Sequence, residues 1–399
     1  MVLGLILAPA LVVAPPAAAT TPFTTVPGPV GGPLLTGPAR VYDVPAGVPP
    51  PPPVTAASYL LADLGTGAVL VAKDPHRPAL PASALKTLTA MTVLPLLSPA
   101  QRYTAVPQDV VEGSKVGMSP GSSYTVQQML QGMMLSSGND AATGLARAAG
   151  GVPQTVALMQ QNAIGLGALD TVVKDPSGLD APGQVTSSYD LALIARAALR
   201  LPAFARLVTT QRVRFPGKQE ALRRSYEIQN HNSLLVNYPG AIGVKNGYTV
   251  AARWTVVGAA TRGGRTYVVT ALTRTDRSWR PTADLLDWAF AHGAKARPIG
   301  RLVDPGEVTA ASAGGAAVPS LEPTPGATVG AAALPGAPGA TSARVLASPV
   351  LGARWRTWVG AGGLAAAALV VAMLALSAHA RRRQLHEVRV ARSARPVRR

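Results

Sequence analysis

Apolar residues form two pairs of strand-length runs, one near each end of the central part of the chain. Residues 58–62 and 68–72 flank Asp63-Leu64-Gly65-Thr66-Gly67, and residues 254–260 and 266–273 flank Arg262-Gly263-Gly264. Short glycine-containing connections between apolar runs are typical of β-hairpins. The pattern therefore predicts four strands, paired as two hairpins that lie far apart in the sequence.

Helical periodicity occupies the region between the two hairpins. Residues 126–135, 154–164 and 188–199 carry apolar side chains three and four positions apart, as one face of a helix requires. Strands at both ends of a domain with helices between them predict an α+β fold with a helical insertion.

Low-complexity sequence flanks the folded domain, which we expect at residues 55–302. Residues 22–54 are rich in Pro, Gly and Val, and the run Pro49–Pro53 favours an extended polyproline conformation. Residues 303–357 are mostly Ala, Gly, Pro, Ser and Thr, which bury too little apolar surface to offset the entropy of ordering. We interpret both segments as linkers.

The two ends of the chain carry apolar segments of a different kind. Residues 1–21 are apolar and then small, which predicts a signal peptide, although no Lys or Arg precedes the apolar stretch. Residues 358–378 contain no charge and are long enough to cross a bilayer as a helix. Two tryptophans precede or begin this span and three arginines, Arg381–Arg383, follow it. By the positive-inside rule we expect a single-pass cell-membrane protein with a basic cytoplasmic tail at 379–399 and the folded domain outside.

Composition excludes several kinds of chemistry. The chain has no cysteine, and its five histidines are scattered without metal-ligand spacing, so we expect no disulfide, no metal and no cofactor. The net charge of +18 is typical of nucleic-acid-binding proteins. The eight arginines of the last 19 residues directly follow the apolar span, however, and are better explained as a topology signal. We therefore expect a membrane partner and no nucleic acid.

A serine and a lysine one helical turn apart form the first candidate site. Ser83-Ala84-Leu85-Lys86 opens an apolar helical run after Pro81, so both side chains lie on one helix face. A lysine whose pKa is lowered by burial serves as the base that a serine nucleophile needs. The N-terminus of a helix also favours a developing oxyanion. A capped surface helix with a solvated lysine is the structural alternative.

Two further motifs follow in order. Ser137-Gly138-Asn139 comes after the helix predicted at 126–135 and places two hydrogen-bonding side chains on a tight loop, although a plain turn has the same composition. Lys245-Asn246-Gly247 leads into the second hairpin. Lys245 is suited to bind a carboxylate, and Gly247 lets a substrate backbone approach closely, whereas an exposed edge-strand lysine is the alternative.

The order S-x-x-K, S-x-N and K-x-G resembles the signature of penicillin-binding proteins and class A β-lactamases. The chain closely resembles the low-molecular-mass serine D-alanyl-D-alanine carboxypeptidases. The resemblance covers most of residues 57–290, including PGSSYTVQQMLQGMMLSSGNDAA, DPSGLDAPGQVTSSYDLALIARAAL and NSLLVNYPGAIGVKNGYT. It implies a penicillin-binding-protein-like antiparallel sheet flanked by helices, with a helical subdomain. It also implies removal of the terminal D-alanine from peptidoglycan stem pentapeptides, with β-lactams as covalent inhibitors.

The resemblance assigns a role to each motif residue. Ser83 is implied to be the acylated nucleophile, Lys86 the base for acylation, and Ser137 the proton relay to the leaving amine. The implied substrate-binding residues are Asn139, Lys245, Asn246, Gly247 and Tyr248, with the backbone N–H groups of Ser83 and Tyr248 forming the oxyanion hole. The family usually has Thr at the position of Asn246. Like Thr, the Asn side chain can donate a hydrogen bond to a carboxylate. The family also uses an arginine beyond this strand, which spacing alone leaves open between Arg277 and Arg280.

Three rival functions are weighed against this interpretation. Gly117-Met118-Ser119-Pro120-Gly121 matches the esterase elbow G-x-S-x-G, but Pro120 lacks the N–H that the elbow needs for its oxyanion hole. A class A-like β-lactamase needs a carboxylate that activates water, and Glu112, Glu220 and Glu227 do not lie in a suitable loop. A catalytically weak, cell-wall-binding homologue is favoured only by Asn246.

Overall fold

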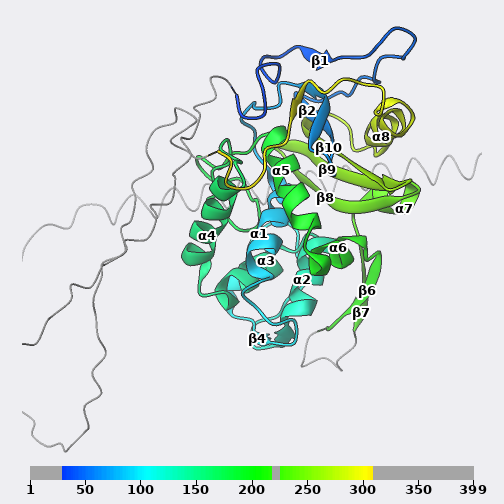
Figure 1. The fold of residues 1–399 in the computed structure, drawn as a ribbon. Coiled ribbons are helices and arrows are strands. Elements are labelled where there is room, and N and C mark those ends of the chain that lie inside the picture. Colours follow the sequence, from blue (N-terminus) through cyan, green and yellow to red (C-terminus); the bar gives the residue numbers. More distant parts are fainter. Residues whose placement is uncertain (1–28, 218–224, 309–399) are drawn as a thin grey trace, which may run out of the picture. The chain divides into compact units, whose positions relative to one another are not determined.

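An antiparallel sheet of seven strands forms the centre of the part of the chain that the computed structural model describes, residues 29–217 and 225–308. The strand order is β1-β3-β2-β10-β9-β8, and β11 also pairs with β3 (Figure 1). The strands are β1 (Arg40–Tyr42), β2 (Ser58–Asp63), β3 (Ala68–Lys73), β8 (Ala241–Thr249), β9 (Arg253–Arg262), β10 (Arg265–Arg274) and β11 (Gly300–Arg301). The four strands predicted from apolar runs are thus confirmed as β2, β3, β9 and β10, and the two hairpins meet where β2 pairs with β10.

The sheet has a hydrophobic core on each face. Side chains alternate between the two faces of a strand, so Leu60 and Ala62 of β2 pack into the core beneath the helices, while Tyr59 and Leu61 pack into the core beneath α8 (Arg280–His292). Every residue of β2 is therefore buried. Burying a leucine side chain contributes about 1.5–3 kcal/mol, so this central strand fixes the position of the strands beside it.

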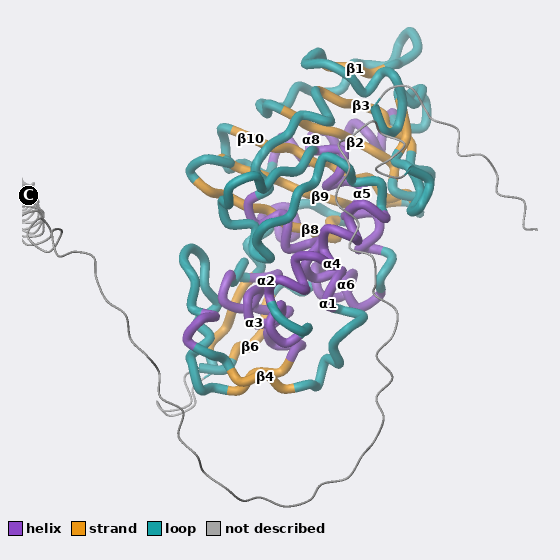
Figure 2. The backbone as a smooth tube through the Cα atoms, turned by 90° about the vertical axis from the view of Figure 1, so that its left-hand side faces the viewer, coloured by secondary structure: helices purple, strands orange, loops and turns teal. Residues whose placement is uncertain are grey.

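The remaining helices lie between the two hairpins in the sequence. They are η1 (Ala82–Leu85), α1 (Lys86–Val93), η2 (Pro107–Asp109), α2 (Val126–Leu135), α3 (Asn139–Ala148), α4 (Val152–Gly165), α5 (Ser188–Leu199), α6 (Pro202–Thr209) and α7 (Ser233–Asn237). Small two-stranded sheets join β4 (Arg102–Thr104) to β5 (Ser123–Thr125) and β6 (Arg212–Phe215) to β7 (Tyr226–Gln229). Figures 1 and 2 show α1–α4 and α6 grouped on the side of the sheet where β8 lies. The predicted helices are confirmed as α2, α4 and α5, and the fold is α+β with a helical subdomain.

The interpretation of residues 22–54 as a linker is wrong for residues 29–54, which pack on the sheet. Within this segment β1 pairs with β3, and Leu35 is only 1% exposed. The proline run keeps its carbonyl groups as acceptors: Trp288 Nε1 donates to Pro49 O at 2.8 Å and Arg40 Nη1 donates to Pro51 O at 3.0 Å. Proline lacks an N–H but not a carbonyl, which is why a proline-rich segment can be fixed by side-chain donors.

The two ends of the folded unit meet. The backbone N–H of Arg301 donates to Gly31 O at 2.9 Å, and Tyr189 Oη donates to Arg301 O at 2.8 Å. Gly31 has a φ of +91°, and a side chain there would overlap the Tyr189 ring. Val303 is also buried, so the fold continues a few residues past the expected boundary at 302.

The expected signal peptide at 1–21, the membrane span at 358–378 and the tail at 379–399 lie outside the described residues. Of the helices within residues 29–217 and 225–308, none has both the length and the apolar character needed to cross a membrane.

Candidate active site

The three sequence motifs meet at one place in the fold. Ser83 lies in η1 and Lys86 begins α1, so the pair spans one 3₁₀ turn rather than the α-helical turn that we predicted. Asn139 begins α3 directly after the Ser137-Gly138 loop. Lys245 lies on β8, the edge strand that packs against η1. Loops far apart in sequence thus converge on the short 3₁₀ turn that carries Ser83.

Lys86 is the centre of a small hydrogen-bond network. Its Nζ lies 2.9 Å from Ser83 Oγ, 2.7 Å from Asn139 Oδ1 and 2.6 Å from the backbone carbonyl oxygen of Ser177. The amide of Asn139 is oriented by a second bond, because its Nδ2 donates to Glu112 O at 2.7 Å. A carbonyl only accepts, so Nδ2 must face Glu112 and Oδ1 must face the lysine.

The three neighbours of Lys86 Nζ can all accept a hydrogen bond, so a protonated amine donates to each of them, Ser83 Oγ included. Asn139 Oδ1 and Ser177 O are both acceptors and take two N–H groups of Lys86. Once the amine is neutral it has two N–H groups and one lone pair, so the bonds to Asn139 and Ser177 are kept and the lone pair can accept the hydroxyl proton of Ser83, 2.9 Å away. The arrangement therefore presents a base to the Ser83 proton without any movement of the lysine.

The surroundings of Lys86 favour that neutral form. The side chain is fully buried, and burial followed by the nearby positive charge of Lys245 lowers its pKa well below the usual value, against a smaller opposite effect of Asp175 and Asp140. Desolvation and a neighbouring like charge both disfavour the protonated amine.

Lys245 is a second buried lysine, and it has no carboxylate partner among the described residues. Its Nζ donates to the carbonyl oxygen of Asn246 at 2.8 Å, and it is 1% exposed. Burial lowers its pKa to about 7. A buried ammonium group without a counter-charge is suited to receive one from a ligand.

Gly247 brings strand β8 against the backbone of Ser83. A methyl group added at Gly247 would lie 2.5 Å from the Ser83 nitrogen and 2.9 Å from Cβ of Ala82, so only glycine fits here. On the other side, Gly178 abuts the carbonyl of Ala82, which has a φ of +45°. A left-handed alanine is strained, and these two contacts hold it, and with it the turn of Ser83, in place.

Ser137 and Asn246 are less directly connected. Ser137 is buried, with a φ of +62°, on the loop that leads to Asn139. Among the described residues no hydrogen bond joins the Ser137 hydroxyl to Ser83 or Lys86. Asn246 is half-buried on β8, and Tyr248, one residue beyond Gly247, is 47% exposed.

Sequence reasoning did not identify the residues that support the network. Asp140 accepts the backbone N–H groups of Val116, Gly117 and Met118 at 2.8–2.9 Å. Asp140 thereby orders the loop that supplies Glu112 O. Likewise, Asp175 Oδ1 accepts from the Ser177 N–H at 2.7 Å. Their roles run through backbone groups, which a side-chain motif does not reveal.

The structure also separates the two candidate arginines. The Arg277 guanidinium lies 5.6 Å from the centre of the Trp254 ring, and the tilted rings of Trp254 and Tyr248 have their centroids 4.6 Å apart. Arg280 instead lies over Trp279 at the start of α8. Partial burial lowers the pKa of His231, and the positive charges of Lys245 and Arg277 lower it further. Arg277 is thus the candidate connected to Tyr248 on β8 through Trp254, and its role in substrate binding stays a prediction.

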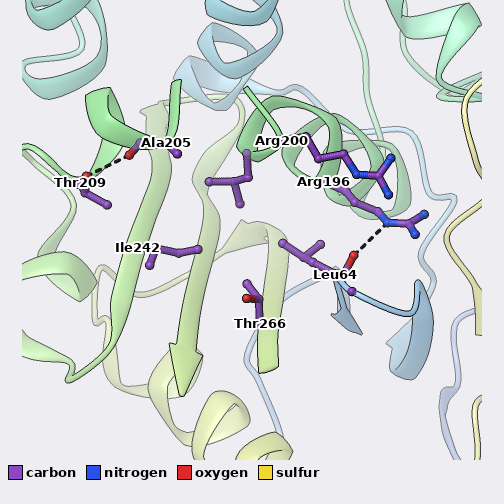
Figure 3. Close-up of a pocket in the computed structure, with 9 residues that line it drawn as sticks. Leu64, Arg196, Arg200, Ala205, Thr209, Ile242 and Thr266 are labelled. Atoms are coloured by element: carbon purple, nitrogen blue, oxygen red, sulfur yellow. Dashed lines mark hydrogen bonds between the residues drawn. The ribbon is translucent and has the colours of Figure 1, made fainter. Parts of the chain in front are cut away.

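A pocket of about 300 Å³ lies elsewhere, between α5, α6 and the sheet (Figure 3). It is lined by Leu64, Gly65, Arg196, Leu199, Arg200, Ala205, Thr209, Ile242 and Thr266. Arg196 Nε is held by Leu64 O at 3.0 Å. None of the motif residues lines this pocket, so it is separate from the candidate active site.

A serine activated by a buried lysine, beside a second lysine on an edge strand, defines a penicillin-binding-type serine hydrolase. The family described as D-alanyl-D-alanine carboxypeptidase matches residues 46–274, and the chain belongs to this family, peptidase family S11. It is 43% identical over 256 residues to D-alanyl-D-alanine carboxypeptidase DacB2 of Mycobacterium tuberculosis, covering 62% of this chain and 86% of that protein. It is 30% identical to DacF of Bacillus subtilis over 59% of this chain and 62% of that protein.

Solved structures agree with this assignment. The crystal structure of a D-alanyl-D-alanine carboxypeptidase from M. tuberculosis H37Rv matches with a TM-score of 0.62 and 40% identity, covering 66% of this chain and all of that one. The Streptomyces K15 DD-transpeptidase matches with a TM-score of 0.57 and 29% identity, covering 61% of this chain and all of that one. The penicillin-binding-protein fold is therefore shown, and the chain is a serine hydrolase of the D-alanyl-D-alanine carboxypeptidase type.

Proposed function

We propose that the chain removes the terminal D-alanine of peptidoglycan stem pentapeptides through an ester on Ser83. Ser83 Oγ attacks the carbonyl carbon of the penultimate D-alanine while Lys86 takes the hydroxyl proton. The peptide bond then breaks, D-alanine leaves with a proton delivered by Ser137, and water hydrolyses the ester. The observation that carries this proposal is the 2.9 Å contact of Lys86 Nζ with Ser83 Oγ, beside two acceptors, Asn139 Oδ1 and Ser177 O, that hold the buried amine in place.

The substrate's carboxylate is the natural partner of Lys245. Within residues 29–217 and 225–308 the buried Lys245 ammonium has no negative partner, and a peptide that ends in a free carboxylate supplies one. The side-chain amide of Asn246 donates a hydrogen bond to the same carboxylate. The guanidinium group of Arg277 adds a second positive charge near it. The oxyanion that forms at the carbonyl is held by the N–H groups of Ser83 and Tyr248, which Gly247 allows to lie close together.

β-Lactams are expected to acylate the same serine. In the part of the chain that the structure describes, no carboxylate hydrogen-bonds to Ser83, and Glu227 pairs with Arg212 on the β6–β7 hairpin instead. A β-lactamase needs such a carboxylate to activate water. We therefore expect slow release of the acyl group and persistent inhibition.

Mass spectrometry of a stem pentapeptide tests the proposal. Incubation with the enzyme should remove one alanine, and penicillin should abolish this loss. Ser83→Ala should lower kcat/KM by at least about 1,000-fold, because the nucleophile is removed. Ser98→Ala, at an exposed serine, is the matched control and should retain parental activity. Covalent labelling of Ser83→Ala by a fluorescent penicillin at the parental level would show that the nucleophile is misassigned.

We also propose that the enzyme works outside the cell membrane, anchored by residues 358–378. The support is the uncharged apolar span, which is followed by eight arginines in the last 19 residues and directly preceded by only Arg354 and Arg356. An anchored enzyme would remain close to newly exported wall peptides.

A further inference from the structure

The order of groups along β8 gives the direction in which a substrate peptide lies, if the proposed function holds. Its terminal carboxylate is at Lys245, and its reacting carbonyl is at Ser83, beside Gly247. The peptide N-terminal to that carbonyl must therefore continue past Tyr248 and towards Thr249, at the end of the strand.

At that end of β8 stands an exposed carboxylate. Asp180 Oδ1 accepts a hydrogen bond from Thr249 Oγ1 at 2.9 Å and thereby joins β8 to the loop that follows α4. Within residues 29–217 and 225–308, Thr249 is the sole hydrogen-bond partner of this carboxylate. Close to Ser83 the buried basic groups are Lys86 and Lys245, while the nearby carboxylates of Asp140 and Asp175 accept hydrogen bonds from backbone N–H groups. Asp180 therefore places an exposed carboxylate at the end of β8, whereas Lys245 places a buried amine further back on the same strand.

The loop that carries Asp180 is held firmly. Gln184 Oε1 accepts from the N–H groups of Lys174 and Asp175 at 2.9–3.0 Å, and its Nε2 donates to Leu179 O at 2.6 Å. The same loop supplies Ser177 O to Lys86. The position of Asp180 relative to Lys86 is thus fixed. A residue that distinguishes substrates by a side chain needs such a fixed position.

We propose that Asp180 selects substrates whose residue before the D-alanyl-D-alanine pair carries a side-chain ammonium group. In a stem peptide that residue is a diamino acid, and its amino group is charged only until it is acylated in a cross-link. Asp180 would then direct the enzyme to stem peptides whose side-chain amino group has not yet been acylated in a cross-link. The carboxylate attracts the ammonium group, and the Thr249 hydroxyl keeps the carboxylate oriented.

Two synthetic tripeptides test this inference. One is Nα-acetyl-L-Lys-D-Ala-D-Ala, with a free ε-ammonium group, and the other is its Nα,Nε-diacetyl form. We expect kcat/KM to be about five-fold higher for the free amine at low ionic strength, as an exposed ion pair allows, and the ratio to fall in 0.5 M salt. Asp180→Asn should bring the ratio close to one, and Asp180→Glu should restore it.

Asp284→Asn is the matched control, because Asp284 is an exposed aspartate on α8, and it should keep the parental ratio. Equal hydrolysis of both tripeptides by the parent, or a ratio that Asp180→Asn leaves unchanged, would overturn the inference while leaving the carboxypeptidase assignment intact. Failure of the parent to hydrolyse either tripeptide would overturn the proposed function and this inference with it.

Discussion

At the scale of single residues, two buried lysines carry opposite requirements. Lys86 must be neutral to accept a proton, and burial and Lys245 lower its pKa. Lys245 must be charged to bind a carboxylate, yet burial lowers its pKa to about 7. The chemistry therefore has a pH window with a different lysine at each limit.

We expect a bell-shaped dependence of kcat/KM on pH. On the acid side, kcat/KM rises as Lys86 loses its proton. Above about pH 7, kcat/KM falls because Lys245 loses its own proton, and the fall is at most about ten-fold per pH unit. Lys245→Arg keeps a positive charge at all these pH values, so its alkaline limb should move upward by more than one pH unit. Steady-state kinetics on a pentapeptide measure both profiles. An alkaline limb at the same pH in both proteins would assign it to another group.

Burial of the charged Lys245 should also lower the free energy of unfolding. The folded-state pKa of Lys245 lies below that of the unfolded chain, so the unfolded state binds more protons between about pH 7 and pH 10.5 and stability rises with pH there. Below pH 7 the cost is fully present. Lys245→Met should raise the free energy of unfolding by about 1–3 kcal/mol at pH 7 or below.

Chemical denaturation at several pH values measures this gain, which should shrink as the pH approaches 10. Lys295→Met, at an exposed lysine, should change stability little at any pH. A Lys245→Met variant that is less stable than the parent at pH 6 would show that the ammonium group is well solvated in the folded state.

At the scale of elements, the contact between β8 and η1 depends on one glycine. Gly247→Ala would force the strand away from the Ser83 nitrogen, 2.5 Å from the new methyl group. Moving a catalytic group by about 1 Å lowers the rate of an enzymatic reaction roughly 100-fold. Stopped-flow acylation by a chromogenic penicillin should show that loss with the fold retained.

Gly165→Ala is the matched control, because Gly165 ends α4 with open space around its Cα. It should acylate normally and be slightly stabilised, by up to about 1 kcal/mol. Parental acylation by Gly247→Ala would show that η1 and β8 separate without affecting the serine.

Sequence patterns predicted the elements better than their contacts. Apolar runs identified β2, β3, β9 and β10, and helical spacing identified α2 and α5, because their burial repeats along the chain. The spacing of Ser83 and Lys86 also predicted their contact. The backbone carbonyl of Ser177 and the segment around β1 were missed, since a carbonyl is common to every residue and a proline-rich sequence has no periodic apolar face.

At the scale of the whole molecule, the described fold ends before the proposed anchor begins. Residues 29–308 contain both cores and every motif residue. A chain that ends at residue 308 should therefore remain folded and hydrolyse a soluble pentapeptide at the parental rate. After cell fractionation it should leave the membrane pellet, whereas the full chain should stay there. A full chain that is recovered without membranes would contradict the proposed anchor.

The meeting of Gly31 with Arg301 has a consequence for how the domain is built. A short peptide bridge across that junction would convert the polypeptide into a nearly closed ring. New termini placed at the open Gly263-Gly264 turn would then yield a circular permutant in which β10 is made first. Because the packing of β2 against β10 depends on position in space and not on the order of synthesis, such a rearranged chain is compatible with the same active centre.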